Sequence, residues 1–185
     1  MIGKINNYEQ FVRLLARNND DRTFLNSDEA HALTVFVQMF RSAMEEVRIF
    51  AGCLCKYIGN EPEYIIALSE FIERGGKLYI LLNAYDESLA KESNLFKRLS
   101  YYKSLSKPVY IKTSNTHPYM LKDGKKNEVH FSVADNKAYR IETDIVKRSA
   151  VCNFNNPVLA KQITELFDEL FAKEDTKDID LLNLF

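Results

Sequence analysis

Three polar residues with chemical potential lie on one predicted strand and in the turn that ends it. Glu128 and His130 alternate along an apolar stretch, and Asp135 follows in the turn. Side chains two residues apart on a strand share a face, so Glu128 could orient the imidazole of His130. An imidazole titrates near neutral pH and can act as a general base or contact a phosphate. The alternative is a buried His130 that only accepts a hydrogen bond in the core.

The dipeptide Asp135-Asn136 predicts a tight turn between two strands, at 128–134 and 137–142. Short polar side chains suit such a turn because they tolerate positive φ and bond their own backbone. Arg140 and Glu142 alternate on the second strand, where they could pair with the face that carries His130. We expect them on a solvated or mutually paired surface.

A third short strand is predicted at 148–154, and it carries Ser149 and Asn153. Together with Glu128, His130 and Asp135, these two residues are the candidates for lining one polar cleft.

Basic residues form two candidate contact surfaces for a polyanion. Lys122, Lys125 and Lys126 form a basic turn that we expect near the mouth of the cleft as ligand-binding residues. A second group lies on the helix predicted at 88–104, where tyrosines lie among the lysines. Basic residues interleaved with tyrosines can follow a phosphate backbone and stack on bases. Ordinary solvated surfaces explain both groups equally well.

The three cysteines allow a metal site to be considered. Cys53 and Cys55 would point to one face of a strand, and Cys152 and His130 could approach them. Structural zinc sites usually combine two closely spaced pairs of ligands, and no second pair exists here. We therefore expect buried free thiols, no metal and no cofactor.

Composition favours a compact protein of the cytoplasm. The chain has 185 residues, of which 46% are hydrophobic, and its formal net charge is −1. This charge gives no global attraction to nucleic acid or to anionic membranes, so polyanion binding requires a local patch. No apolar run approaches the ~20 residues that span a bilayer, and the first residues lack the plan of a secretory signal. An odd number of cysteines without a spaced framework favours a reducing compartment.

The order of elements predicts an α/β fold: a mixed β-sheet flanked by helices on both faces. An N-terminal helical extension is expected at 1–46, an α/β domain at 47–173 and a charged tail at 174–185. Within the domain, strands near 47–53, 77–82 and 109–113 alternate with helices. The hairpin, the third short strand and a helix from Pro157 to about Lys173 follow.

From Val47 to Lys173 the chain resembles one half of a phospholipase D-like (HKD) phosphodiesterase. Members of that superfamily carry His-x-Lys-x4-Asp followed by a Ser/Gly and Asn strand, whereas this chain has Glu128-x-His130-x4-Asp135. The resemblance places Glu128 at the position of the nucleophilic histidine and His130 at that of the lysine. Ser149 and Asn153 correspond to the later strand with one extra residue between them.

The resemblance implies a polar cleft that has lost its attacking group, in a bacterial-type protein. Because family active sites combine two halves, it also implies a homodimer. We expect a degenerate binding module for a phosphate-bearing ligand, such as nucleic acid, or for a protein partner. One alternative is a divergent phosphodiesterase or nuclease that uses His130, assisted by Lys125 or Lys126. Another is a structural adaptor that acts through the N-terminal helices and residues 181–185.

Overall fold

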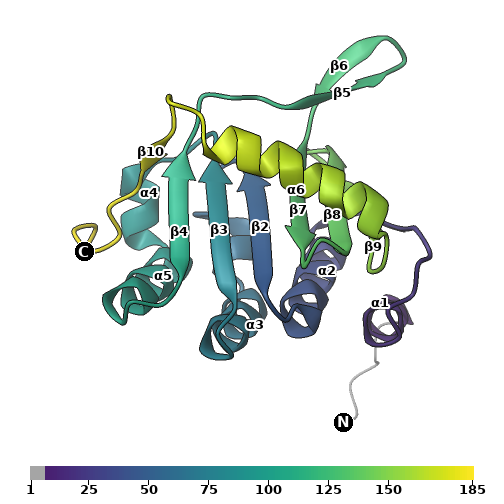
Figure 1. The fold of residues 1–185 in the computed structure, drawn as a ribbon, viewed down its shortest axis with the longest axis horizontal. Helices are drawn as coiled ribbons and strands as arrows, with labels where there is room; N and C mark the ends of the chain where they lie inside the picture. The colour runs from purple at the N-terminus through teal and green to yellow at the C-terminus, as the bar shows by residue number, and fades with distance from the viewer. Residues whose placement is uncertain (1–6) are drawn as a thin grey trace.

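An eight-stranded mixed sheet with helices on both faces forms the body of the computed structural model (Figure 1). The predicted α/β class is therefore confirmed. The structure describes residues 7–185, without the side chain of Lys122. The first six residues of the expected N-terminal extension lie outside this range. No helix in the described part of the chain is long and apolar enough to cross a membrane.

The strand order across the sheet is β1-β9-β8-β7-β2-β3-β4-β10. β2, β3 and β4 are parallel neighbours, whereas the remaining pairs are antiparallel. A separate two-stranded hairpin, β5–β6, projects beyond the carboxyl edge of β2–β4 (Figure 1). The strands are β1 Phe24–Asn26, β2 Glu46–Ala51, β3 Lys77–Leu82, β4 Val109–Thr113, β5 Tyr119–Lys122, β6 Lys125–Glu128, β7 His130–Ala134, β8 Ala138–Asp144, β9 Ser149–Asn153 and β10 Lys177–Asp178.

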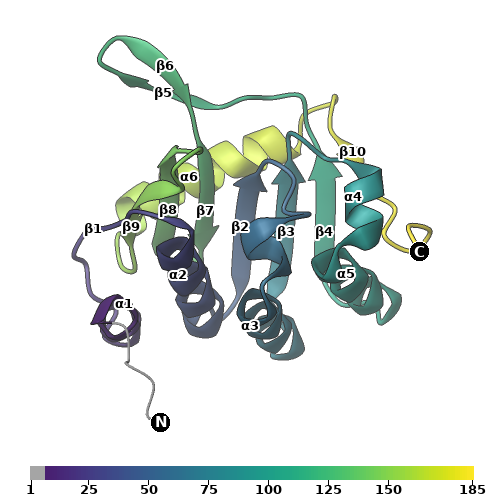
Figure 2. The ribbon, with the colours of Figure 1, turned by 180° about the vertical axis from the view of Figure 1, so that it is seen from behind.

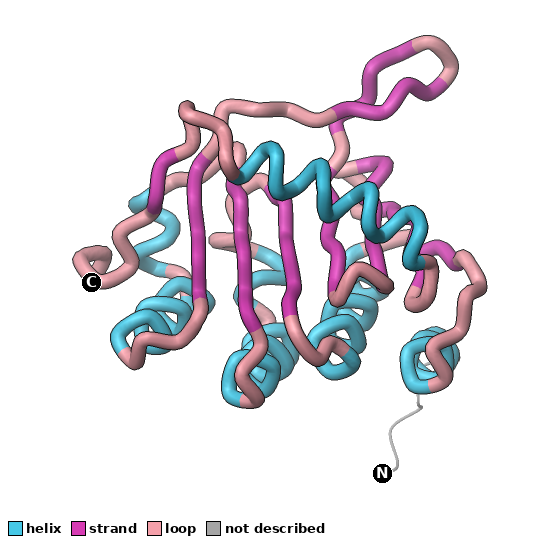
Figure 3. The backbone as a smooth tube through the Cα atoms, in the orientation of Figure 1, coloured by secondary structure: helices cyan, strands magenta, loops and turns pink. Residues whose placement is uncertain are grey.

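Three helices, α2, α3 and α5, line one face of the sheet, and α6 lies across the other (Figures 2 and 3). We call these two sides the α2 face and the α6 face. The α-helices are α1 Asn7–Arg17, α2 Glu29–Ser42, α3 Pro62–Glu73, α4 Glu87–Glu92, α5 Asn94–Ser104 and α6 Pro157–Phe171, with a short 3-10 helix at Tyr57–Asn60.

Side-chain hydrogen bonds mark where several helices begin. Asp28 caps α2 by accepting from the backbone N–H of His31, and Asn156 caps α6 before Pro157. The single helix expected at 88–104 is two helices, because Ser93 ends α4 and caps α5. Its side chain accepts a hydrogen bond from the N–H of Phe96.

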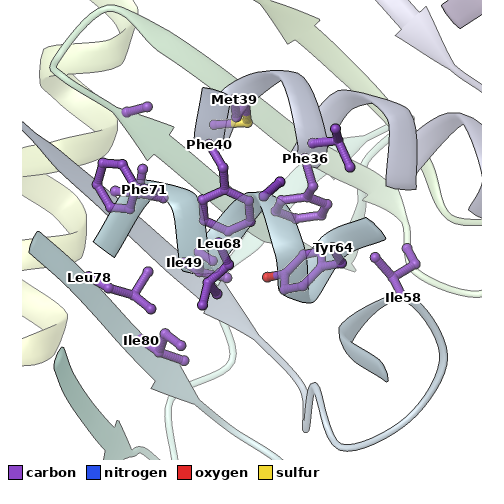
Figure 4. Packing of buried hydrophobic residues seen from close by; sticks show 14 of the residues in the cluster. Phe36, Met39, Phe40, Ile49, Ile58, Tyr64, Leu68, Phe71, Leu78 and Ile80 are labelled. Carbon is purple, nitrogen blue, oxygen red and sulfur yellow. The ribbon is translucent and has the colours of Figure 1, made fainter. Parts of the chain in front are cut away.

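Apolar side chains fill both faces of the sheet. On the α2 face, aromatic rings of α2 and α3 pack together above the strands, as Figure 4 shows for Phe36, Phe40, Tyr64 and Phe71. The α6 face has its own cluster, made of Phe50, Leu81, Phe131, Val133, Tyr139, Ala160, Ile163, Phe167 and Leu170. Neighbouring residues of a strand face opposite ways, so Ser132, which lies between Phe131 and Val133, must point to the α2 face.

Segments outside 47–173 also belong to the sheet and its core. β1 pairs with β9, and α2 packs on the α2 face. At the other end, β10 pairs with β4, and the side chains of Leu181 and Leu184 are buried in the core. Two residues of the C-terminal segment therefore pack on their own chain, while Leu182 and Phe185 are exposed.

Candidate functional site

A pocket of about 410 Å³ opens on the α2 face at the carboxyl ends of β2 and β3. In open α/β sheets this edge is where ligands usually bind. β7 and β8 supply its polar side chains, and the loop from Gly52 to Gly59 forms one wall. We call it the Arg140 pocket.

Its floor holds a network of buried charges on β8 and β7. Nη2 of Arg140 donates to Oε1 of Glu142 at 3.1 Å, and Nδ1 of His130 lies 3.2 Å from Oε2. Nη1 of Arg148 approaches the same Oε2 at 3.7 Å. The side chains of Arg140 and Glu142 are only 3% and 4% exposed. Strand alternation explains the grouping, because 130 and 132 on β7 face 142 and 140 on β8 in register.

Two guanidinium groups thus share one carboxylate. Burial by itself raises the pKa of Glu142, but the hydrogen bond with His130 and the charges of Arg140 and Arg148 outweigh it, so the pKa is lowered. Glu142 is therefore ionised at neutral pH. An ionised carboxylate only accepts hydrogen bonds, which places a proton on Nδ1 of His130. One positive charge remains in excess at the floor even with a neutral imidazole.

Several polar atoms of the floor have no hydrogen bond within the described residues. Nε of Arg140 donates to Asn26 and Nη2 to Glu142 and the carbonyl of Arg148, which leaves Nη1 without an acceptor. Oγ of Ser132 has none, and the nearest charged partner of Nε2 of His130 is Oε1 of Glu128 at 3.9 Å. All three side chains line the pocket. The site therefore offers donors that a ligand could use.

A second polar network surrounds Glu128, the last residue of β6, just before the chain enters β7. Oε1 of Glu128 lies 2.8 Å from Nδ1 of His117 and accepts from Nδ2 of Asn83 at 2.8 Å. Desolvation raises the pKa of Glu128, but these two hydrogen bonds and the neighbouring imidazoles lower it overall. With side chains 57% and 38% exposed, His117 and Glu128 stand at the mouth.

The wall loop contains a disulfide. Cys53 and Cys55 are bonded to each other, so the expectation of free thiols is wrong for this pair. The cysteines lie beyond the end of β2, where a left-handed Leu54 (φ 57°) lets the chain turn and brings them together. At the end of the loop, the backbone of Gly59 lies close against the carbonyl oxygen of Leu54. A Cβ at this position would collide with that oxygen, so glycine is required. Cys152 is a buried free cysteine, and burial raises the pKa of its thiol to about 12.

Of the five residues expected to line one cleft, Glu128 and His130 do so and three do not. Asp135 lies at the other end of β7, where its carboxylate accepts from the backbone N–H groups of Met44, Glu45 and Glu46 at 2.7, 2.9 and 3.0 Å. It ties the β7–β8 turn to β2.

The two residues of β9 also serve the scaffold. Nδ2 of Asn153 donates to the carbonyl of Asp21 at 2.7 Å, and Oγ of Ser149 donates to the carbonyl of Ser27 at 3.3 Å. Both bonds hold the segment around β1, which sequence analysis did not predict, against the sheet.

The basic turn is the tip of the β5–β6 hairpin. Lys125 and Lys126 are exposed, and Lys126 lies over the ring of Tyr119, 4.2 Å from its centroid. Lys126 and Glu128 also line a smaller cleft with Thr143. The hairpin and the Arg140 pocket meet at Glu128, while Lys125 and Lys126 are exposed to solvent.

Three residues of the site, Asn83, His117 and Arg148, were not predicted from the sequence, and neither was the burial of the pair Arg140 and Glu142. That pair was expected at a surface, but both side chains are buried. A signal was present, because Arg140 and Glu142 alternate with Tyr139 and Ile141 on a strand whose neighbour carries His130. Asn83 and His117 carried no signal, since they lie in loops that only the fold brings together. Within the described residues, no group of three or more His, Cys, Asp or Glu could hold a metal ion.

Comparisons with known proteins identify the architecture. No family model and no curated protein matches the sequence. Among solved structures, the archaeal chromatin protein TrmBL2, described as showing a novel mode of DNA binding, superposes with a TM-score of 0.63 at 14% identity. The match covers 92% of this chain and 61% of TrmBL2, so the chain spans less than two thirds of that protein.

Two further structures match over 85% of this chain and 99% of their own. Nuc from Salmonella typhimurium, a phospholipase D family member, has a TM-score of 0.56 at 15% identity. NucT from Helicobacter pylori has 0.57 at 12% identity. At such identities the likeness establishes the fold alone. The mixed sheet with its β7–β8 ribbon beside β2 is a phospholipase D-like fold.

Proposed function

We propose that this protein is a phospholipase D-like module that binds a phosphate-bearing ligand in the Arg140 pocket. The observation that carries the proposal is the pair of guanidinium groups, Arg140 and Arg148, that share the single carboxylate of Glu142. The excess charge is that of Arg148, whose side chain is 30% exposed, and it favours an anion beside it. A bound phosphate supplies that anion.

The free atoms of the floor suit phosphate oxygens. Nη1 of Arg140 and Oγ of Ser132 are donors without acceptors among the described residues, and Nε2 of His130 becomes one on protonation. Arg148 is more accessible, with its side chain 30% exposed. Arginine is the residue best shaped for phosphate oxygens because its planar fork presents parallel N–H groups.

Binding rather than turnover is favoured by Glu128. The resemblance puts this residue where the family has its attacking histidine. The lowered pKa of Glu128, caused by His117 and Asn83 against the effect of burial, keeps it an anion. Hydrogen bonds from two neighbours lower the nucleophilicity of this carboxylate, and its negative charge repels that of a phosphate.

Titration with inorganic phosphate at pH 7, followed by calorimetry, tests this proposal. We expect saturable one-site binding that weakens about tenfold or more in Arg148→Met, because a charge-assisted contact is lost. Lys161→Met, on the exposed side of α6, is the matched control and should bind like the parent chain. Equal affinity of Arg148→Met and the parent, or no binding by either, would refute the proposal.

Nucleic acid is one ligand of this class, and the β5–β6 hairpin supplies the supporting feature. Exposed lysines and Tyr119 project beyond the pocket, and TrmBL2 is described as binding DNA. The double variant Lys125→Glu, Lys126→Glu should weaken binding of a fluorescent oligonucleotide and lower its salt dependence. The same charge reversal on α6, Lys161→Glu, serves as control. An unchanged salt slope would exclude the hairpin as a nucleic-acid contact.

A second candidate function, phosphodiester cleavage, is favoured by one observation. Nδ1 of His130 is held by the buried Glu142, which directs Nε2 into the pocket, the arrangement that a base or nucleophile requires. Hydrolysis of bis(p-nitrophenyl) phosphate tests it. A phosphodiesterase should lose this activity in His130→Gln while its unfolding curve stays close to that of the parent. Absence of activity in the parent chain would leave binding as the function.

A homodimer is the assembly that the resemblance implies. Light scattering coupled to size exclusion should then give twice the 21.5 kDa mass of the chain. A mass of one chain across the micromolar range would refute it.

A further inference from the structure

The Arg140 pocket is much larger than a phosphate group. Its volume of about 410 Å³ falls within the roughly 300–1,000 Å³ that is typical of sites for whole small molecules. The free donors of Arg140 and Ser132, and the free Nε2 of His130, occupy the floor alone. Most of the remaining space has apolar boundaries.

Those boundaries come from three separate elements. Phe36 projects from α2, Ile58 from the 3-10 helix and Leu89 from α4, and all three line the pocket. The aromatic ring of Tyr57 stands at the mouth with 63% of its surface exposed, and the guanidinium of Arg148 lies 5.8 Å from the ring centroid. An anion at the floor would therefore leave its organic part against apolar and aromatic surface.

The depth of the floor excludes one kind of phosphate. The side chain of Arg140 is 3% exposed. A phosphate inside a duplex backbone carries a bulky sugar on each side and cannot descend to such a buried group. A small ester can, because it enters as a whole.

We infer that the ligand of this pocket is a small phosphate ester with a compact apolar or aromatic body. The phosphate binds Arg140, Arg148 and Ser132, and the body packs against Phe36, Ile58 and Leu89. This inference rests on the proposed function, which it narrows from phosphate-bearing ligands in general to one chemical class. Contacts of the hairpin lysines with nucleic acid are a separate matter.

Calorimetric titrations with phenyl phosphate, inorganic phosphate and phenol at pH 7 test the inference. Phenyl phosphate should bind about tenfold or more tightly than inorganic phosphate, since burial of a ring of this size is worth that factor. Phenol should not bind measurably, because it lacks the anion. A single-stranded oligonucleotide without terminal phosphates should not displace phenyl phosphate.

Two variants separate this inference from the proposed function. Leu89→Ala removes part of the apolar wall, and it should reduce the advantage of phenyl phosphate while leaving inorganic phosphate unaffected. Arg148→Met should weaken both ligands. If inorganic phosphate binds and phenyl phosphate binds no tighter, or if the oligonucleotide displaces it, the inference falls and the proposed function stands. If neither phosphate binds, both fall.

Discussion

The two ends of the β7–β8 ribbon each carry a carboxylate, and the two carboxylates have different surroundings. At the turn, Asp135 accepts three hydrogen bonds from the backbone between α2 and β2. At the open end, Glu142 faces two arginines and a histidine. The carboxylate of Asp135 has its hydrogen bonds supplied by neutral backbone donors. The carboxylate of Glu142 lies in a cluster that retains excess positive charge and donors without acceptors.

This difference distinguishes a structural carboxylate from one that organises a binding site. Backbone N–H groups cannot turn toward a ligand, so the turn is closed to further chemistry. Guanidinium groups have more donors than one carboxylate can accept, and the surplus remains available. The motif of the phospholipase D-like proteins emphasises Asp135, but the binding chemistry that we propose lies at the other end of the same ribbon.

The largest effect is expected from Glu142→Gln, which removes the buried carboxylate that pairs with Arg140. Arg140 would then be a buried charge without a counterion, and we expect a loss of about 3 kcal/mol or more in unfolding free energy. Urea denaturation measures it. Glu165→Gln, at an exposed position of α6, should change stability by less than about 0.5 kcal/mol. A comparable small loss in Glu142→Gln would contradict the description of the floor.

Glu142 should also shape the dependence of stability on pH. Its pKa in the folded chain lies below the ordinary value of 4.5, so its contribution is present above that value and is lost as the pH falls through the folded pKa. Urea midpoints between pH 3 and pH 6 should therefore fall more steeply with acid in the parent than in Glu142→Gln. Parallel curves would show that this carboxylate has no lowered pKa.

A smaller effect is expected from Asp135→Asn, which weakens three charge-assisted hydrogen bonds at the turn. Asparagine keeps the size and tolerates the positive φ of 51°, so the loss should be about 1–3 kcal/mol. Phosphate affinity, measured on the folded variant, should not change. Asp123→Asn, in the exposed turn of the β5–β6 hairpin, is the control for the substitution itself. Loss of phosphate binding in Asp135→Asn would show that the turn and the pocket are energetically coupled, and would contradict the separation of the two ends of the ribbon.

The smallest effect on stability is expected from Arg148→Met. Its 30% exposed side chain loses one long ion pair, so the unfolding free energy should change by less than about 1 kcal/mol although phosphate binding weakens about tenfold or more. Denaturation and calorimetry on the same sample compare the two properties. A large loss of stability would make Arg148 a structural partner of Glu142 instead of a ligand-binding residue.

Much of the fold follows from local patterns. The mixed sheet, the strands β2, β3 and β4 that alternate with helices, the helix α6 and the Asp135-Asn136 turn were all predicted, and both turn residues have positive φ. The basic turn was predicted, but β1 and the strands β5 and β6 on either side of that turn were not, because three or four residues of mixed polarity carry no usable period. The pairing of Cys53 with Cys55 also escaped, since it depends on a left-handed residue between them.

The sequence by itself determined which residues alternate on the β7–β8 ribbon, and hence that Glu128, His130 and Glu142 can share a sheet face. Only the tertiary structure decided that this face is buried beneath α2 and the wall loop from Gly52 to Gly59. It also decided that Asn83 and His117 reach Glu128. The scaffold roles of Asp135, Ser149 and Asn153 likewise became visible only in the fold. Alternation is a property of one strand, whereas burial and the neutralisation of charge depend on what the rest of the chain packs against it.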